Sequence, residues 1–165
     1  MLDAGIDKQT LLAALIAQVE AKLAELRTGY GAARDAVLST PHVMKSKREV
    51  FGQESAYLAN ALALNIQERE LELRILRSLR PPLDSQRVAQ GCVVGLGQEN
   101  GEPEEFYFLL PVCGGMEVPA QGGGGVVRVI TSGTPIAKAL LGKSFGDEVA
   151  LPTAPPRGAW VRLLQ

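Results

Sequence analysis

The sequence predicts an α+β protein in which an N-terminal antiparallel two-helix coiled coil precedes a β-rich domain with one short helix. Two observations carry this prediction. Apolar residues recur at alternating spacings of three and four through the first half of the chain, which is the period of a coiled coil. After Pro81-Pro82 that period gives way to short β-type runs separated by glycine-rich turns. We therefore expect a hairpin over residues 1–80 and a second domain over residues 83–165.

The first helix is expected from Lys8 to Leu38. Its apolar seam consists of Leu12, Ile16, Val19, Leu23, Leu26, Tyr30, Ala33 and Val37. A helix with an apolar face of this length needs a partner helix, because on its own that face would be exposed to water.

The second helix is expected from about Lys45 to Leu79, after a turn at residues 39–42 in which Pro41 cannot continue a helix. Its expected seam consists of Tyr57, Ala61, Leu64, Glu68, Leu71 and Ile75, with Leu58, Leu62 and Leu76 widening the apolar face. A short turn between two long helices predicts an antiparallel hairpin.

The second half should hold five strands and one helix. The expected strands are Arg87 to Leu96, Glu105 to Val112, Val126 to Ile130, Glu148 to Leu151 and Ala159 to Leu164. The expected helix runs from about Pro135 to Leu141, with Thr134 as N-cap, Pro135 at the first helical position and Gly142 as the C-terminal stop.

Composition bounds the function. A net charge of −1 excludes a protein held on nucleic acid mainly by bulk positive charge, so any such contact must be local. Two cysteines are too few for a disulfide scaffold and suit buried thiols in a reducing compartment. We expect a cytoplasmic monomer with no membrane contact, no bound metal and no other cofactor.

The segment Thr134 to Lys143, TPIAKALLGK, followed by Gly146-Asp147-Glu148-Val149, resembles the C-terminal signature of the GreA/GreB transcript-cleavage factors. The resemblance implies an FKBP-like fold for the second domain and bacterial RNA polymerase as the partner. It also implies that the coiled coil enters the polymerase secondary channel. Gly133, Thr134, Pro135 and Ile136 would then form the loop that contacts the channel rim. A well-capped helix start accounts for the same four residues, and the two interpretations are compatible.

Cleavage-stimulating members of that family carry an acidic pair at the hairpin tip, where two carboxylates can hold Mg²⁺ for phosphodiester hydrolysis. Aligning the family tyrosine with Tyr57 places Val50 and Gln53 at those positions, and neither is acidic. Glu49 and Glu54 lie one residue away and could form a shifted pair. The tip is basic instead, with Lys45, Lys47 and Arg48, which suits local contact with RNA or nucleotide or a solvated helix face.

Three functions follow from these observations. The first is a noncatalytic Gre-like factor that modulates transcription from the secondary channel. The second is a cleavage-stimulating elongation factor that uses Glu49 and Glu54. The third is an FKBP-like prolyl isomerase or chaperone, although pockets of that kind are lined by aromatic residues and this chain is 5% aromatic.

Overall fold

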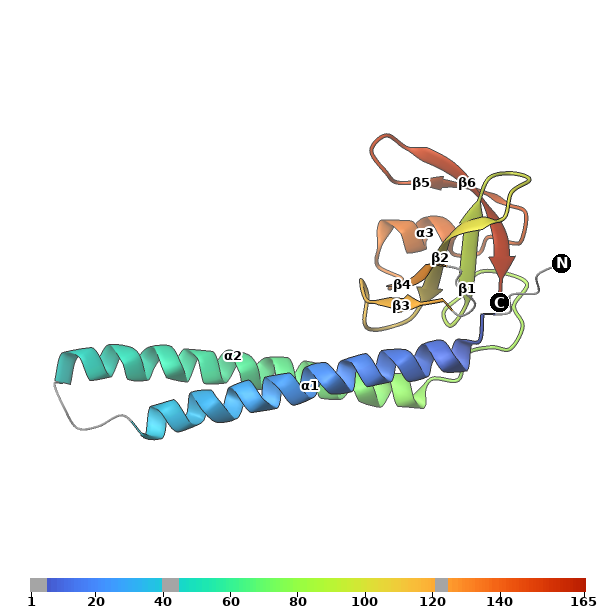
Figure 1. Cartoon of the computed structure of the whole chain (residues 1–165). Helices are drawn as coiled ribbons and strands as arrows, with labels where there is room; N and C mark the ends of the chain where they lie inside the picture. Colours follow the sequence, from blue (N-terminus) through green and yellow to red (C-terminus); the bar gives the residue numbers. More distant parts are fainter. Residues whose placement is uncertain (1–5, 40–44, 121–124) are drawn as a thin grey trace. The chain divides into compact units, whose positions relative to one another are not determined.

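The computed structural model describes residues 6–39, 45–120 and 125–165, without the side chains of residues 45–49 and 51. Two long helices, α1 (Lys8–Leu38) and α2 (Lys45–Ser78), precede a six-stranded sheet with one short helix (Figure 1). The α+β class and the order of its parts are therefore confirmed. The predicted turn residues Thr40, Pro41 and His42 lie outside the described residues.

Helix α1 begins and ends where its period predicts. The Asp7 carboxylate caps it by accepting hydrogen bonds from the backbone N–H groups of Gln9 at 3.0 Å and Thr10 at 3.3 Å. Hydrogen bonds, chiefly from the Thr10 side chain, hold the pKa of Asp7 below its ordinary value. Every residue of the expected seam is buried or half-buried except Val37, which is 39% exposed.

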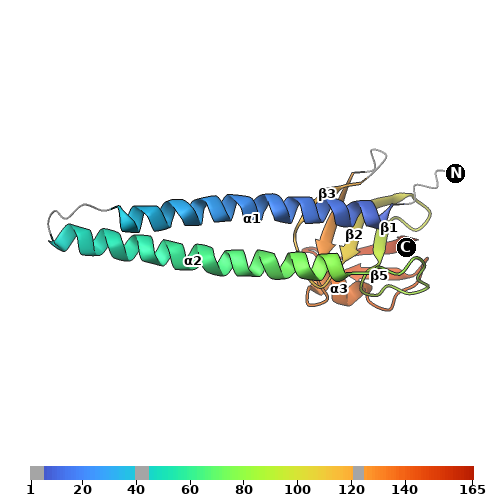
Figure 2. The same ribbon diagram turned by 90° about the horizontal axis from the view of Figure 1, so that it is seen from below.

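Helix α2 runs antiparallel beside α1, as both views show (Figures 1 and 2), but the predicted seam is wrong. Tyr57, Leu64 and Leu71 are 75%, 64% and 51% exposed. The less exposed line follows residues 52, 55, 59, 62, 66, 69, 73 and 76, again at spacings of three and four. Four of these are Gly52, Ser55, Ala59 and Arg69, so apolar content alone pointed to the wrong face.

Contacts across the hairpin fit the corrected line. Leu62 lies against Gly29 of α1, where a Cβ would be 3.7 Å from the Leu62 Cδ1. Near the middle of the hairpin Arg27 Nη2 donates to Glu70 Oε1 at 2.8 Å, an exposed ion pair. The small residues Gly52, Ser55 and Ala59 on the inner line of α2 suit close approach of the two helices.

The sheet contains β1 (Val93–Gly97), β2 (Pro103–Leu109), β3 (Glu117–Pro119), β4 (Val126–Ile130), β5 (Glu148–Leu151) and β6 (Arg157–Leu164). Its strand order is β3-β4-β2-β1-β6-β5, and only the β2–β4 pair is parallel. Strand β1 pairs with both β2 and β6 and has four fully buried residues. Strands β2 and β1 therefore lie in the middle of the sheet.

Prediction and structure differ in four strands. The first strand begins at Val93 rather than Arg87, the second runs from Pro103 to Leu109, and the last begins at Arg157. Strand β3 was missed because Glu117-Val118-Pro119 is short and contains proline. Cys92 and Cys113 lie outside the strands, although both thiols are buried as expected.

Helix α3 (Pro135–Leu140) covers one face of the sheet and ends one residue earlier than predicted. Ala137 and Leu140 belong to one core cluster with buried side chains of five strands, among them Leu109, Ile130, Val149 and Val161. These residues are at most 4% exposed, so they form a dry core. Because α3 has only six residues, it covers a limited part of this face.

Contacts divide the chain into two compact units. One is Ile16–Arg74, the greater part of the hairpin. The other joins the segment ending at Leu15 with Ile75–Gln165, and thus includes the sheet. In this second unit Lys8, a buried residue, donates its ammonium to the Pro82 carbonyl. None of the described helices is both long enough and apolar enough to cross a membrane.

Candidate partner-binding site

The predicted rim-contact residues form the turn that leads into α3. Thr134 donates its hydroxyl to the Thr131 carbonyl at 2.9 Å, and its Oγ1 accepts from the Ala137 N–H at 3.3 Å. Thr134 is thus the N-cap that the sequence predicts, with Pro135 at the helix start. Gly133 and Pro135 are exposed, while Thr134 and Ile136 are half-buried.

The second half of the signature closes α3 and begins β5. Gly142 has φ +78°, a left-handed conformation that favours glycine, and its N–H donates to the Val88 carbonyl at 2.9 Å. The Asp147 carboxylate accepts from the Ser144 N–H at 2.7 Å. The Lys143 ammonium donates to the Glu148 carbonyl at 3.0 Å. The signature therefore has a structural role here besides any contact with a partner.

A pocket of about 380 Å³ adjoins the turn, and the Ile136 side chain forms part of its wall. Charged side chains contribute five of its eleven lining residues. The complete lining is Glu104, Glu105, Phe106, Tyr107, Glu117, Val126, Arg128, Ile136, Leu151, Thr153 and Arg157. A lining that mixes apolar and charged side chains suits a protein side chain or short segment better than an apolar small molecule.

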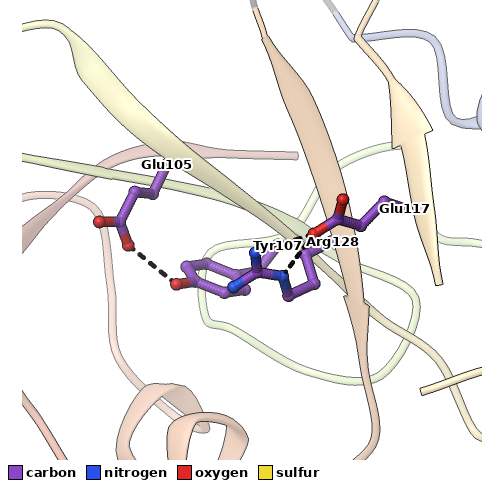
Figure 3. A network of polar contacts seen from close by, with 4 residues as sticks. All are labelled: Glu105, Tyr107, Glu117 and Arg128. Carbon is purple, nitrogen blue, oxygen red and sulfur yellow. Dashed lines mark hydrogen bonds and ion pairs between the residues drawn. The ribbon is translucent and has the colours of Figure 1, made fainter. Parts of the chain in front are cut away.

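Two ion pairs line this pocket, Glu105–Arg157 and Glu117–Arg128, and Figure 3 shows the second of them with the Tyr107–Glu105 hydrogen bond. Tyr107 Oη donates to Glu105 Oε2 at 2.8 Å, and Glu105 Oε1 also accepts from Arg157. Arg128 donates through Nε and Nη2 to Glu117 Oε1 at 3.0 and 2.8 Å. Glu105 therefore joins β2 to β6, and Arg128 joins β4 to β3.

Burial and the Glu105 carboxylate together raise the pKa of Tyr107 to about 12. Hydrogen bonds from Arg157 and Tyr107 lower the pKa of Glu105 despite the opposing effect of burial, the largest single influence on it. At neutral pH the phenol is thus a neutral donor and Glu105 an anion. Tyr107, Glu105 and Arg157 therefore form a hydrogen-bonded polar side of the pocket, and Tyr107 and Glu105 are not a proton-transfer pair.

Sequence reasoning missed Glu105, Tyr107, Arg128 and Arg157. One signal was available: Arg128 interrupts the apolar run VVRVI of β4, which indicates a polar contact on that face. No comparable pattern in the sequence indicated which strands far apart along the chain would pair. The contacts of Arg157 with β2 depend on a sheet order that spacing alone does not give.

The predicted tip residues lie in or near the first turns of α2. Gln53 and Glu54 are exposed, and Val50 is 57% exposed. The side chains of Lys45, Lys47, Arg48 and Glu49 lie outside the described ones, although their backbone is helical. The rim-contact residues and the tip belong to different units.

No family model matches the chain. No curated protein matches it in sequence. Among solved structures it is similar to GreA factor homolog 1 (Gfh1) of Thermus thermophilus, with 22% identity over 91% of this chain and 94% of that chain and a TM-score of 0.37.

A structure of the transcription factor Gfh1 gives 21% identity over 92% of this chain and 94% of that one, with a TM-score of 0.39. Thermus aquaticus Gfh1 gives 20% identity over 95% and 93%, with a TM-score of 0.36. At these identities and TM-scores the similarity carries no assignment of function to this chain.

Proposed function

We propose that this chain is a noncatalytic Gre-like factor that binds bacterial RNA polymerase at its secondary channel and modulates transcription in the cytoplasm. The observation that carries the proposal is the segment at residues 134–149, which resembles the family's C-terminal signature and whose start would form the rim-contact loop. Its first residues form a partly exposed turn beside a pocket that five charged side chains help to line. Such a turn and pocket suit contact with another protein.

The hairpin tip supports the noncatalytic part of the proposal. Val50 and Gln53 occupy the positions of the family's acidic pair, and neither side chain supplies a carboxylate for Mg²⁺. Because neither position is acidic, the tip would add no carboxylate ligand for Mg²⁺, and every protein ligand of that ion would have to come from the polymerase. Binding can therefore persist while cleavage is not stimulated.

The shifted pair Glu49 and Glu54 is poorly placed for metal binding. Both residues belong to α2, so a five-residue separation sets them about 140° apart around the helix axis. Two carboxylates that share one Mg²⁺ must point toward the same ion. Stimulated transcript cleavage that Glu49→Ala/Glu54→Ala abolishes would restore this alternative.

The proposal is tested by binding to core RNA polymerase in competition with a cleavage-competent Gre factor. The unmodified chain should displace the competitor, and Pro135→Ala/Ile136→Ala should lose most of that displacement. Leu83→Ala is the matched control, because Leu83 is apolar and 95% exposed in the same unit but belongs to neither the signature nor the pocket lining. Absence of any polymerase binding by the unmodified chain would refute the proposal.

A further inference from the structure

Strand β5 lies at one edge of the sheet: β6 is its neighbour on one side, and no described strand pairs with its other side (Figure 1). The outward N–H and C=O groups of such an edge strand can pair with a strand of another molecule. Strand β5 contains no proline, and its first and third residues, Glu148 and Ala150, are exposed. Edge strands of this kind either receive a partner or are covered by other groups of the chain.

The hydrogen bonds to β6 fix which backbone groups of β5 point outward. Just before β5 begins, the Val161 N–H of β6 donates to the Asp147 carbonyl at 2.9 Å. In an antiparallel ladder hydrogen-bonded pairs alternate with pairs that are not hydrogen-bonded, so Val149, two positions along, also bonds to β6. Glu148 and Ala150 therefore turn their backbone N–H and C=O groups away from β6.

A lysine side chain covers one of these outward groups. The Lys143 ammonium donates to the Glu148 carbonyl at 3.0 Å. Lys143 is half-buried, and its backbone is fixed on both sides, because its N–H donates to the Leu140 carbonyl at 3.0 Å and its carbonyl accepts from the Val88 N–H at 2.8 Å. The ammonium is thus held at the edge of β5, and it must be displaced before another chain can bond to the Glu148 carbonyl.

We propose that Lys143 keeps this chain monomeric by blocking antiparallel pairing of β5 with β5 of a second copy. The pairing that it blocks is self-complementary, with a two-fold axis at Val149. Glu148 of one copy then faces Ala150 of the other, and the outward groups of these two residues exchange both backbone hydrogen bonds. Because Lys143 occupies the Glu148 carbonyl in each copy, it removes an acceptor from both facing pairs.

Lys143→Met tests the proposal, because methionine is also long and unbranched but has no ammonium. Sedimentation velocity on the full chain should show Lys143→Met dimerising with a Kd on the order of 100 µM, since the interface is smaller than a standard one and the two Glu148 carboxylates lie near each other. The unmodified chain should stay monomeric from about 10 µM to about 1 mM, a range that brackets this constant. Lys138→Met, which replaces an exposed lysine of the same signature, is the matched control and should also stay monomeric.

Proline at position 150 tests whether the dimer forms through this edge. The Ala150 N–H points outward, so Ala150→Pro removes no hydrogen bond to β6 but takes a donor from each facing pair. Lys143→Met/Ala150→Pro should therefore be monomeric again. Amide hydrogen exchange gives a second measurement: at the highest concentration the Glu148 and Ala150 amides of Lys143→Met should exchange several-fold more slowly than in the unmodified chain, whereas Val149 should change little.

If Lys143 only ties its turn to β5, Lys143→Met should be easier to unfold in urea and remain monomeric, which would overturn the proposal. A dimer of Lys143→Met that leaves the Glu148 and Ala150 amides unprotected, or a dimeric unmodified chain, would overturn it as well. Should Ala150→Pro itself fail to fold, as circular dichroism would show, the exchange of these two amides in Lys143→Met decides. None of these outcomes depends on polymerase binding, so the proposed function is tested separately.

Discussion

The buried Tyr107 hydroxyl makes stability depend on alkaline pH. Its pKa in the folded chain is about 12, whereas an unperturbed tyrosine titrates near pH 10. A raised folded-state pKa means that the stabilisation is complete below about pH 10 and is lost as the pH rises through about 12. In urea unfolding at about pH 9, 10 and 11, we expect Tyr107→Phe to lose this part of the pH dependence.

At pH 9 the same variant should be less stable by roughly 1.5–3 kcal/mol, the usual range for a hydrogen bond to a charged acceptor. Tyr57→Phe is the matched control, because it removes a hydroxyl from a side chain that is 75% exposed. If the free energy of unfolding depends on pH in the same way for the unmodified chain and Tyr107→Phe, the hydrogen bond described between Tyr107 and Glu105 is contradicted.

Gly95 and Gly31 should respond to alanine with opposite signs. A Cβ at Gly95 in β1 would lie 2.8 Å from the Cβ atoms of both Leu163 and Pro103, so Gly95→Ala should cost roughly 1–3 kcal/mol. A Cβ at Gly31 in α1 meets nothing within 4 Å, so Gly31→Ala should stabilise the helix by up to about 1 kcal/mol. Thermal unfolding of both variants measures the difference.

Within helix α2, Leu62 and Leu64 provide a direct test of which face packs on α1. Leu62 is half-buried beside Gly29, so Leu62→Ala should lower the free energy of unfolding by roughly 1–2 kcal/mol. Leu64 is 64% exposed, so Leu64→Ala should change it by less than about 0.5 kcal/mol. Both are measured at low protein concentration, and the reverse ranking would restore the seam first predicted from sequence.

Elements with strong local signals were predictable from the sequence. Helix α1 and strands β4 and β5 have the predicted bounds, Thr134 is the N-cap of α3 as expected, and Gly142 follows directly after its C-cap, Leu141. Helix α2 shows where such reasoning fails. It carries heptad spacing on two faces, and the inner face uses Gly52, Ser55 and Ala59, whose small size permits helix contact but gives little hydrophobic signal.

The candidate site was predictable only where it is continuous in sequence. The turn at residues 133–136 could be found from its motif, because cap, proline and helix are adjacent. The Glu105–Arg157 pair could not, because its members are 52 positions apart and meet through the order of β2, β1 and β6. Tertiary ion pairs of this kind leave no local periodicity.

For the molecule as a whole, hydrogen exchange should distinguish the two units. Val93, Val94 and Phe108 are fully buried in the middle of the sheet, whereas the start of α2 has Val50, Tyr57 and Leu58 more than half exposed. Amides of β1 and β2 should therefore exchange much more slowly than those of residues 50–60. Equal protection in both regions would mean that the chain opens only as one cooperative whole.

The edge strand β3 also has a consequence for solubility. It is only three residues long, has an exposed Glu117, and ends at Pro119, which has no backbone N–H to offer another chain. A strand of another molecule therefore has few free backbone groups of β3 to pair with, which disfavours amyloid-like stacking at this edge. At high protein concentration, precipitation through this edge should therefore be rare.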